Sequence, residues 1–278
     1  MSVTVANITI PNAEERFVEL SHGTTRYIEA GSSGIPTILI HGVNYTGGAH
    51  EWFLNIGALS EKLHVYAVDA LAWGMGKGFL QQEYSFAYLV DFIREFQDAL
   101  GIEKANLVGH SMGGWLSSLF AYESPNRVNK LVLVASGGAM PRQLKSMVEF
   151  QDPTREDLRK VLAGRVDANS GVEIEALTDY HYALCGNPDR LAAYRRVLAH
   201  MNNMETRSRY NTVRRFPHIN VPTLVVWGTD DTTNALEMGE MTRDGIPGAK
   251  MVVFDKIGHG VPTEAPEQLN KALLEFLP

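Results

Sequence analysis

The chain has 278 residues, of which 45% are hydrophobic and 21% charged, a composition typical of a globular protein with a sizeable core. Its net charge of −7 and the lack of a basic run argue against nucleic acid or an anionic membrane as a partner. The single cysteine, Cys185, excludes an intrachain disulfide and fits a cytoplasmic location. The first residues lack the pattern of a signal peptide, and the apolar stretches are shorter than a membrane span.

The first elements that we predict are two strands joined by a tight turn. Residues 17–20 and 25–30 flank a short polar segment, which indicates an antiparallel hairpin. Later apolar runs are too hydrophobic for half-exposed strands and predict buried parallel strands at residues 37–40, 65–68, 106–108, 131–134, 223–226 and 251–254. Helical patterns cover residues 84–100, 112–123, 235–242 and 266–276. This alternation predicts an α/β fold: a mainly parallel sheet of about eight strands flanked by helices.

One region, residues 137–218, interrupts the alternation because it contains no convincing strand. Asp152-Pro153 and Asn187-Pro188 each offer an N-cap followed by proline at the first helical position. We therefore predict a helical lid at residues 137–218, inserted into a core formed by residues 1–136 and 219–278. The lid should cover the carboxyl edge of the sheet, where ligands bind in open α/β sheets.

The motif that carries the chemistry is Gly109-His110-Ser111-Met112-Gly113, which fits G-x-S-x-G. It follows a buried strand and precedes a helix, the context in which this motif places a nucleophilic serine on a sharp turn. The glycines keep side chains from colliding at that turn. Ser111 is therefore our predicted nucleophile, and the backbone N–H of Met112 is a predicted oxyanion donor.

A serine hydroxyl needs a base, and His259 is the histidine that follows the last predicted strand. This position puts it at the same edge of the sheet as Ser111. The acid must also follow a strand, and Asp230 and Asp231 compete for that role after residues 223–226. We favour Asp231, because the earlier position in such a turn usually caps the turn or faces solvent. Its role would be to hold the imidazole in the correct tautomer.

The loop after residues 37–40 should supply the second oxyanion donor, for which we predict the N–H of Val43. Asn44, Tyr45 and Thr46 in this loop either contact the substrate or shape the loop. In a second loop, Trp73 and Met75 either line a pocket or belong to the core. The predicted substrate-binding residues are Asn44, Tyr45, Trp73, His110 and Tyr180.

Over nearly its whole length the chain resembles the α/β-hydrolase superfamily. The resemblance rests on His41-Gly42, the Gly109–Gly114 turn, the segment at residues 228–231, and Gly258-His259. Within the superfamily, the chain is most similar to the meta-cleavage-product hydrolases and to small carboxylesterases. The resemblance to the former implies hydrolysis of carbon–carbon bonds in ring-cleavage products by way of a keto tautomer.

The chain departs from the meta-cleavage-product hydrolases at several positions. It has His110 where they have asparagine, Gly260 where they have tryptophan, and Tyr180 where alignment on Asn187-Pro188 expects their lid arginine. Its oxyanion loop also differs from their glycine-rich loop. Our first prediction is therefore an esterase-type serine hydrolase of a small acyl substrate, and the alternative is a carbon–carbon hydrolase. The acidic substrate of that alternative needs a cation, for which Arg142, Arg165 and Arg190 are the candidates.

Two further alternatives use the same fold: a cofactor-free lyase or oxygenase, and a ligand receptor with slow turnover. We expect no cofactor and no metal, because the sequence lacks H-E-x-x-H, a multi-cysteine site and a dinucleotide-binding glycine motif. The expected partner is a small-molecule substrate. The sequence leaves a homodimer open.

Overall fold

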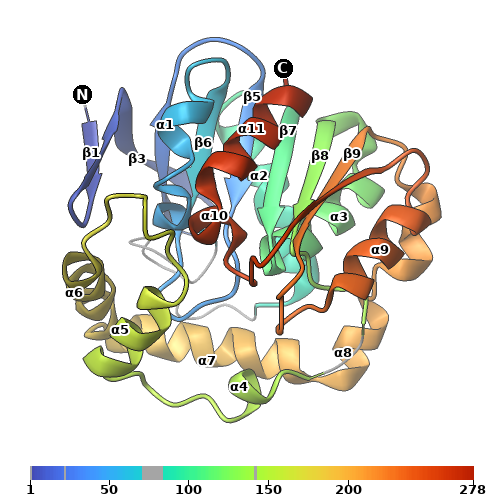
Figure 1. The fold of residues 1–278 in the computed structure, drawn as a ribbon. Helices are drawn as coiled ribbons and strands as arrows, with labels where there is room; N and C mark the ends of the chain where they lie inside the picture. The colour runs from blue at the N-terminus through green and yellow to red at the C-terminus, as the bar shows by residue number, and fades with distance from the viewer. Residues whose placement is uncertain (1, 22, 71–83, 141–142) are drawn as a thin grey trace.

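The structure of the protein is a computed structural model that describes residues 2–21, 23–70, 84–140 and 143–278. Its main sheet has the strand order β10-β9-β8-β7-β5-β6-β4-β3 (Figure 1). These strands are β3 (Ala13–Leu20), β4 (Gly23–Ala30), β5 (Pro36–Ile40), β6 (His64–Val68), β7 (Ala105–His110), β8 (Val128–Val134), β9 (Thr223–Gly228) and β10 (Lys250–Phe254). In this order, the six strands β10, β9, β8, β7, β5 and β6 are all parallel to their neighbours. Strand β4 is antiparallel to β6, and β3 is antiparallel to β4, so these two strands form an antiparallel edge. The predicted α/β sheet of eight strands is confirmed.

Strand alternation divides the interior into two apolar layers. In β8, Leu131 and Leu133 face one layer, while Val132 and Val134 face the other. The first layer packs against α2 (Phe86–Ala99) and α3 (Met112–Glu123), and the second against α1 (Ile56–Leu59) and α11 (Pro266–Phe276). Both faces of the sheet are therefore covered by helices, as long apolar runs in parallel strands require.

The remaining elements that the structure describes outside residues 137–218 are a small ribbon, two helices and two 3-10 turns. They are a two-stranded ribbon of β1 (Ser2–Val5) and β2 (Ile8–Pro11), the helices α9 (Leu236–Gly245) and α10 (Val261–Glu264), and the 3-10 turns η1 (Ala49–Trp52) and η2 (Pro125–Arg127). The ribbon is not among the elements that we predict from the sequence. Its four-residue strands alternate between exposed and buried positions and are shorter than a pattern that can be recognised from sequence.

The described part of residues 137–218 contains helices and no strand. The helices are α4 (Lys145–Val148), α5 (Arg155–Ala163), α6 (Ile174–Cys185), α7 (Pro188–Asn202) and α8 (Met204–Arg209), followed by the 3-10 turn η3 (Val213–His218). Figure 1 shows α4, α5, α6 and α7 together beyond one end of the sheet.

The two predicted helix starts in this region differ in outcome. Asn187 caps α7 and Pro188 is its first residue, as predicted. The predicted cap Asp152 is wrong, because α5 is capped by Thr154, whose hydroxyl accepts a hydrogen bond from the N–H of Asp157. The carboxylate of Asp157 accepts in return from the N–H of Thr154, which completes a capping box.

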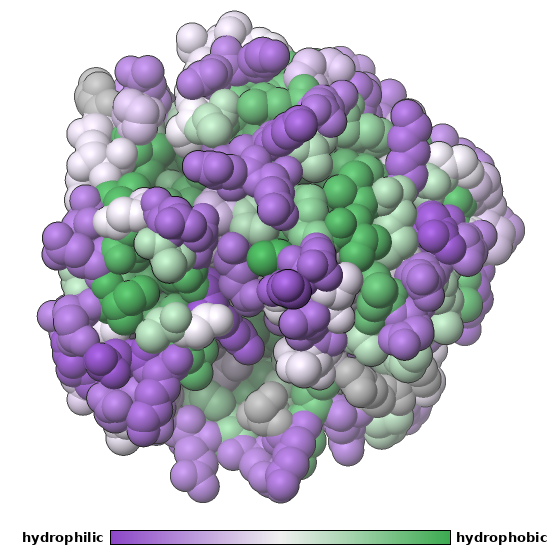
Figure 2. Space-filling model, in the orientation of Figure 1, coloured by the Kyte–Doolittle hydropathy of each residue, from purple (hydrophilic) through white to green (hydrophobic). Residues whose placement is uncertain are grey.

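Helices α5 and α6 are linked by ion pairs at the surface. Arg155 contacts Glu175 and Asp179, and Arg159 also contacts Glu175. Figure 2 shows hydrophilic side chains gathered over these two helices. Such exposed pairs contribute little to stability, and Leu158 is the only residue of α5 that is buried. None of the helices in the described residues has the length and apolar character that a membrane crossing requires.

Candidate active site

The turn between β7 and α3 holds Ser111 in a strained conformation, with φ 52° and ψ −111°. Two glycines make this turn sterically accessible. A Cβ on Gly109 would lie 2.3 Å from the carbonyl oxygen of Gly113, and a Cβ on Gly113 would lie 2.1 Å from that of Ile40. Strain of this kind persists only where the surroundings enforce it, which is typical of a nucleophile on a strand-to-helix turn.

The structure brings Ser111, His259 and Asp231 together in one chain of hydrogen bonds. The Nε2 of His259 lies 3.0 Å from the Oγ of Ser111, and its Nδ1 lies 2.8 Å from the Oδ2 of Asp231. The other carboxylate oxygen of Asp231 accepts bonds of 2.8 Å from the N–H groups of Thr233 and Asn234. A carboxylate fixed on both oxygens orients the imidazole so that Nε2 can accept the serine proton.

The electrostatics suit His259 to act as a base. Burial lowers the pKa of His259 below its ordinary value, against the effect of the hydrogen bond to Asp231, and the nearby positive charges of His110 and Arg165 lower it further. The imidazole is therefore neutral at neutral pH, with a free lone pair on Nε2.

The neighbouring aspartates after β9 have different surroundings. Asp231 is 5% exposed as a residue, and its fully buried carboxylate faces His259. Asp230 is exposed and accepts a hydrogen bond of 2.9 Å from the hydroxyl of Thr229. The geometry thus supports the choice of Asp231 over Asp230.

The two predicted oxyanion donors belong to segments that lie next to Ser111. Met112 is the first residue of α3, a position whose N–H has no partner within the helix. Val43 lines the same pocket as Ser111. The preceding Gly42 packs tightly here, since a Cβ on it would lie 3.1 Å from both His110 and Ser111.

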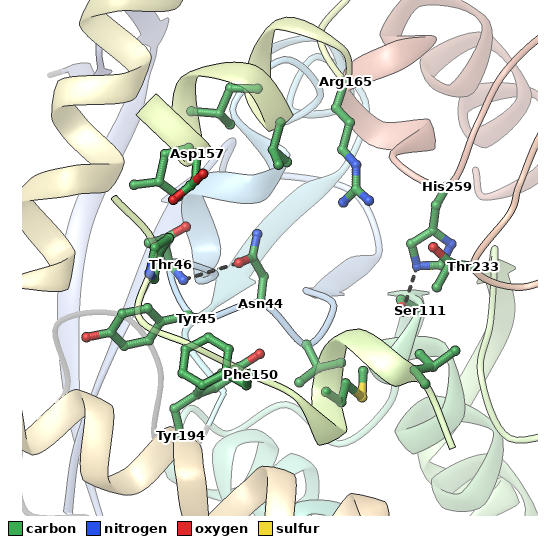
Figure 3. Close-up of a pocket in the computed structure, with 17 residues that line it drawn as sticks. Asn44, Tyr45, Thr46, Ser111, Phe150, Asp157, Arg165, Tyr194, Thr233 and His259 are labelled. Carbon is green, nitrogen blue, oxygen red and sulfur yellow. Dashed lines mark hydrogen bonds between the residues drawn. The ribbon is translucent and has the colours of Figure 1, made fainter. Parts of the chain in front are cut away.

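A pocket of about 320 Å³ opens in front of Ser111 and His259 (Figure 3). This volume suits a small organic molecule. The predicted residues Asn44 and Tyr45 line it, as does Thr46. The other lining residues are Leu144, Met147, Phe150, Pro153, Asp157, Leu158, Val161, Leu162, Arg165, Tyr194 and Thr233. Most of these come from residues 144–165, so this helical segment and the loops at the edge of the sheet form the pocket together.

The three candidate cations of the lid segment differ in position. Arg165 lines the pocket, and Figure 3 shows its guanidinium extending toward the space between Asn44 and His259. Arg190 is buried elsewhere, where its guanidinium donates to the carbonyl oxygens of Tyr45 and Gly47 at 2.9 and 2.6 Å. The third candidate, Arg142, lies outside the described residues.

The structure places two of the predicted substrate-binding residues outside this pocket. Tyr180 packs against His50 and accepts a hydrogen bond from Arg26, because its face of α6 turns toward the core. His110 is 6% exposed, and its ring nitrogens form hydrogen bonds with the Glu51 carboxylate and with the backbone carbonyl oxygen of His259. Trp73 and Met75 lie outside the described residues.

Sequence reasoning missed Glu51, Phe150 and Tyr194. Glu51 approaches the site only through the fold, since it lies 59 residues from its partner His110. Phe150 and Tyr194 form an aromatic cluster with Tyr45, with ring centroids 5.0 to 5.6 Å apart. Only a known lid packing could have placed these rings. Among the residues that the structure describes, no three His, Cys, Asp or Glu side chains are grouped to hold a metal ion.

Comparisons with known proteins agree with this architecture. The family model of the alpha/beta hydrolase fold matches residues 36–266. A 2-hydroxy-6-oxononadienedioate/2-hydroxy-6-oxononatrienedioate hydrolase of Paraburkholderia phymatum is 30% identical, covering 95% of this chain and 96% of its own. A 2-hydroxy-6-oxo-6-phenylhexa-2,4-dienoate hydrolase of Comamonas testosteroni is 29% identical, covering 93% of each chain. The solved structure of a meta-cleavage product hydrolase from Pseudomonas fluorescens IP01 superposes with a TM-score of 0.81 at 26% identity, covering 94% of this chain and 96% of its own.

A doubly covered parallel sheet with a serine on the turn after a central strand defines the class of α/β hydrolases. The chain belongs to the alpha/beta hydrolase fold family, and it is a hydrolase. The resemblance to meta-cleavage-product hydrolases is confirmed by these relatives.

Proposed function

We propose that the protein is a serine hydrolase that cleaves a carbon–carbon bond in a keto acid of the 2-hydroxy-6-oxo-dienoate type. The relatives named above are hydrolases of such compounds. They support the carbon–carbon alternative better than our first prediction from sequence, the esterase. A compound of this type carries a carboxylate at one end and a ketone toward the other, so its site needs a cation and a nucleophile in one pocket.

Arg165 is the observation that carries this proposal. Its guanidinium lies in the same pocket as Ser111 and His259. Among the described residues, no carboxylate forms an ion pair with it, and the acidic pocket residue Asp157 is engaged in the cap of α5. The charge of Arg165 is thus available to a substrate carboxylate. In this proposal Arg165 takes the role of the lid arginine of the meta-cleavage-product hydrolases, which the alignment on Asn187-Pro188 places at Tyr180.

The site groups then act in sequence. The Oγ of Ser111 attacks the ketone carbon of the keto tautomer while His259 takes the hydroxyl proton. The N–H groups of Met112 and Val43 stabilise the oxyanion, and Asp231 stabilises the imidazolium. The carbon–carbon bond breaks, its electron pair is delocalised into the conjugated second carbonyl group, and the leaving carbon receives the proton from His259. Water then hydrolyses the acyl-serine, releasing a carboxylic acid and restoring Ser111.

Residues 137–218 are, in this proposal, a lid that selects the substrate, and residues 1–136 and 219–278 form the catalytic core. The contributions of residues 144–165 to the pocket support this division. The aromatic side chains of Tyr45, Phe150 and Tyr194 suit the uncharged part of the substrate. The proposed partner is this small molecule, and the proposed location is the cytoplasm.

The test compares 2-hydroxy-6-oxo-6-phenylhexa-2,4-dienoate with a neutral aryl ester. We expect cleavage of the keto acid by the wild type and a loss of about a thousandfold or more in Ser111→Ala. Arg165→Gln should raise KM for the keto acid by about tenfold, equivalent to 1.4 kcal/mol, and leave ester hydrolysis unchanged.

Arg195→Gln is the matched control, because Arg195 is an exposed arginine of α7 outside the pocket lining. It should leave both activities unchanged. Ester hydrolysis without keto-acid cleavage would instead support the esterase. A keto-acid KM that is equal in wild type and Arg165→Gln would remove Arg165 from the site.

A further inference from the structure

A buried histidine beside the nucleophile faces a hydrogen-bond acceptor at each ring nitrogen. The Nδ1 of His110 lies 2.9 Å from a carboxylate oxygen of Glu51, and its Nε2 lies 2.8 Å from the backbone carbonyl oxygen of His259. Neither acceptor can donate while the carboxylate is ionised. Both bonds form together only when both nitrogens carry protons, so His110 is an imidazolium ion.

Glu51 extends this contact to the oxyanion loop. Its carboxylate accepts from the N–H of Gly42, at 3.0 and 3.3 Å for the two oxygens. Gly42 immediately precedes Val43, the proposed oxyanion donor. The pair therefore connects three segments that meet only in the folded protein: the loop after β5, the end of β7, and the loop that carries His259.

We propose that Glu51 and His110 are a positioning pair, which holds the oxyanion loop and the His259 loop in register with Ser111. The inference rests on the proposed role of Ser111 as nucleophile. Neither residue lines the pocket, so the pair acts through the groups that it tethers. An ion pair suits this task because its charge-assisted bonds are stronger than neutral ones and are directional.

The surrounding charges are consistent with this arrangement. Burial lowers the pKa of His110, but the Glu51 carboxylate outweighs this effect and raises the pKa above its ordinary value. The hydrogen bond to the His259 carbonyl and the charge of Asp231 make smaller contributions in the same direction. Burial raises the pKa of Glu51, but the His110 imidazolium outweighs this effect and lowers the pKa below its ordinary value, and His41 acts in the same direction as His110. Around His259 the facing charges are Asp231, His110 and Arg165.

Glu51→Gln separates charge from shape. The Glu51 oxygen that faces His110 also accepts from Gly42, so a glutamine carbonyl oxygen can occupy the same place. Without the carboxylate, burial disfavours the imidazolium, and His110 loses one proton. A neutral imidazole cannot donate both to the introduced amide and to the His259 carbonyl, so the tether to the His259 loop weakens.

The removal of that charge also acts on the base. The rings of His110 and His259 lie 5.0 Å apart between centroids, and the imidazolium charge lowers the pKa of His259. Once His110 is neutral, the pKa of His259 rises. The reaction of Ser111 should then require a higher pH. If Glu51 served only to accept the hydrogen bond from Gly42, which glutamine also accepts, the pH dependence of the Ser111 reaction would not shift.

The experiment measures the rate at which a fluorophosphonate labels Ser111, as a function of pH, in wild type and Glu51→Gln. We expect the rate to fall by about tenfold or more at neutral pH, and the acid limb to move up by about half a pH unit or more. In parallel, nitrogen NMR of the wild-type His110 ring should show protons on both nitrogens at pH 7.5, and Glu51→Gln should show one. Thermal melting verifies the fold of each variant.

Glu29→Gln provides the matched control. Glu29 pairs with His64 at 2.6 Å, and His64 opens β6, so this second pair lies at the amino end of the parallel strands, away from Ser111. The control should change neither the labelling rate nor its pH dependence.

The outcomes separate this inference from the proposed function. A singly protonated His110 in the wild type, or an unshifted acid limb in folded Glu51→Gln, would overturn the positioning pair. The NMR result remains decisive should Glu51→Gln fail to fold. Normal labelling without keto-acid cleavage would refute the proposed substrate class and leave the pair intact.

Discussion

Helices α3 and α5 approach the same pocket, yet they are anchored in opposite ways. Ten of the 12 residues of α3 are buried, whereas in α5 only Leu158 of nine is buried. Helix α3 begins at the nucleophile and packs between the sheet and α2. Helix α5 lines the opposite side of the pocket and is joined to α6 by exposed ion pairs.

This difference assigns separate tasks to the two regions. The groups that make and break bonds need positions fixed to within a fraction of an ångström, and a close-packed core provides them. The exposed side chains of α5 can change at little cost in stability, so we expect this helix to influence which substrate fits. Changes to the core should therefore abolish the chemistry, and changes at the lid should have graded effects.

The largest effect should come from Asp231→Asn. Asparagine keeps the volume, but its amide can present an N–H to His259 and favour the wrong tautomer. We expect the turnover of any substrate that acylates Ser111 to fall by about a thousandfold or more, with the melting temperature little changed. Asp230→Asn is the control, because Asp230 is exposed on the same turn and its carboxylate accepts a hydrogen bond only from the hydroxyl of Thr229 among the described contacts. Equal losses in the two variants would contradict the triad.

The sequence predicted the fold and the chemical groups of the core because local patterns encode them. Buried strands appear as apolar runs, and the positions of Ser111 and His259 follow from strand ends at a common edge of the sheet. The two adjacent aspartates required a choice that the hydrogen bond from His259 to Asp231 now supports.

Features that depend on tertiary packing could not be predicted in the same way. The face of α6 that carries Tyr180 is oriented by contacts with His50 and Arg26, far away in the chain. The partnership of Glu51 with His110 likewise leaves no local pattern. In α5, two competing cap signals lie two residues apart, and the reciprocal bonds of Thr154 and Asp157 prevail over Asp152.

A steric change in the core should have the next largest effect. A Cβ at Gly113 would meet the backbone of β5 at 2.1 Å from the oxygen of Ile40, and neither partner can move without disturbing the sheet. We expect Gly113→Ala to lower the free energy of unfolding by about 3 kcal/mol or more, measured by urea unfolding.

Gly164→Ala tests the same substitution at the end of α5. There the nearest atoms to the added Cβ would be 3.7 and 3.8 Å away, at ordinary contact distance, and the backbone is right-handed. Its stability should stay within about 0.5 kcal/mol of the wild type. A Gly164→Ala protein as unstable as Gly113→Ala would show that α5 is packed as tightly as the core.

The smallest effect should come from the contact between the lid segment and the oxyanion loop. His181 of α6 lies 2.7 Å from the hydroxyl of Thr46, and burial lowers the pKa of His181 to about 4. The unfolded chain therefore binds a proton at His181 below about pH 6.5, while the folded protein does so only near pH 4. Stability is lost as the pH falls through this interval and is retained above it.

We therefore expect wild type to lose about 1 kcal/mol more than His181→Gln between pH 7.5 and pH 5.5, measured by urea unfolding at each pH. His218→Gln serves as the control, because His218 is an exposed histidine that lies away from this contact. Its stability should follow the wild-type dependence on pH. If His181→Gln followed that dependence as well, protonation of His181 would not be coupled to unfolding. The contact between His181 and Thr46 would then contribute little to stability. In that case α6, like α5, would belong to the part of the molecule whose side chains can change at little cost, and this part would extend closer to Ser111.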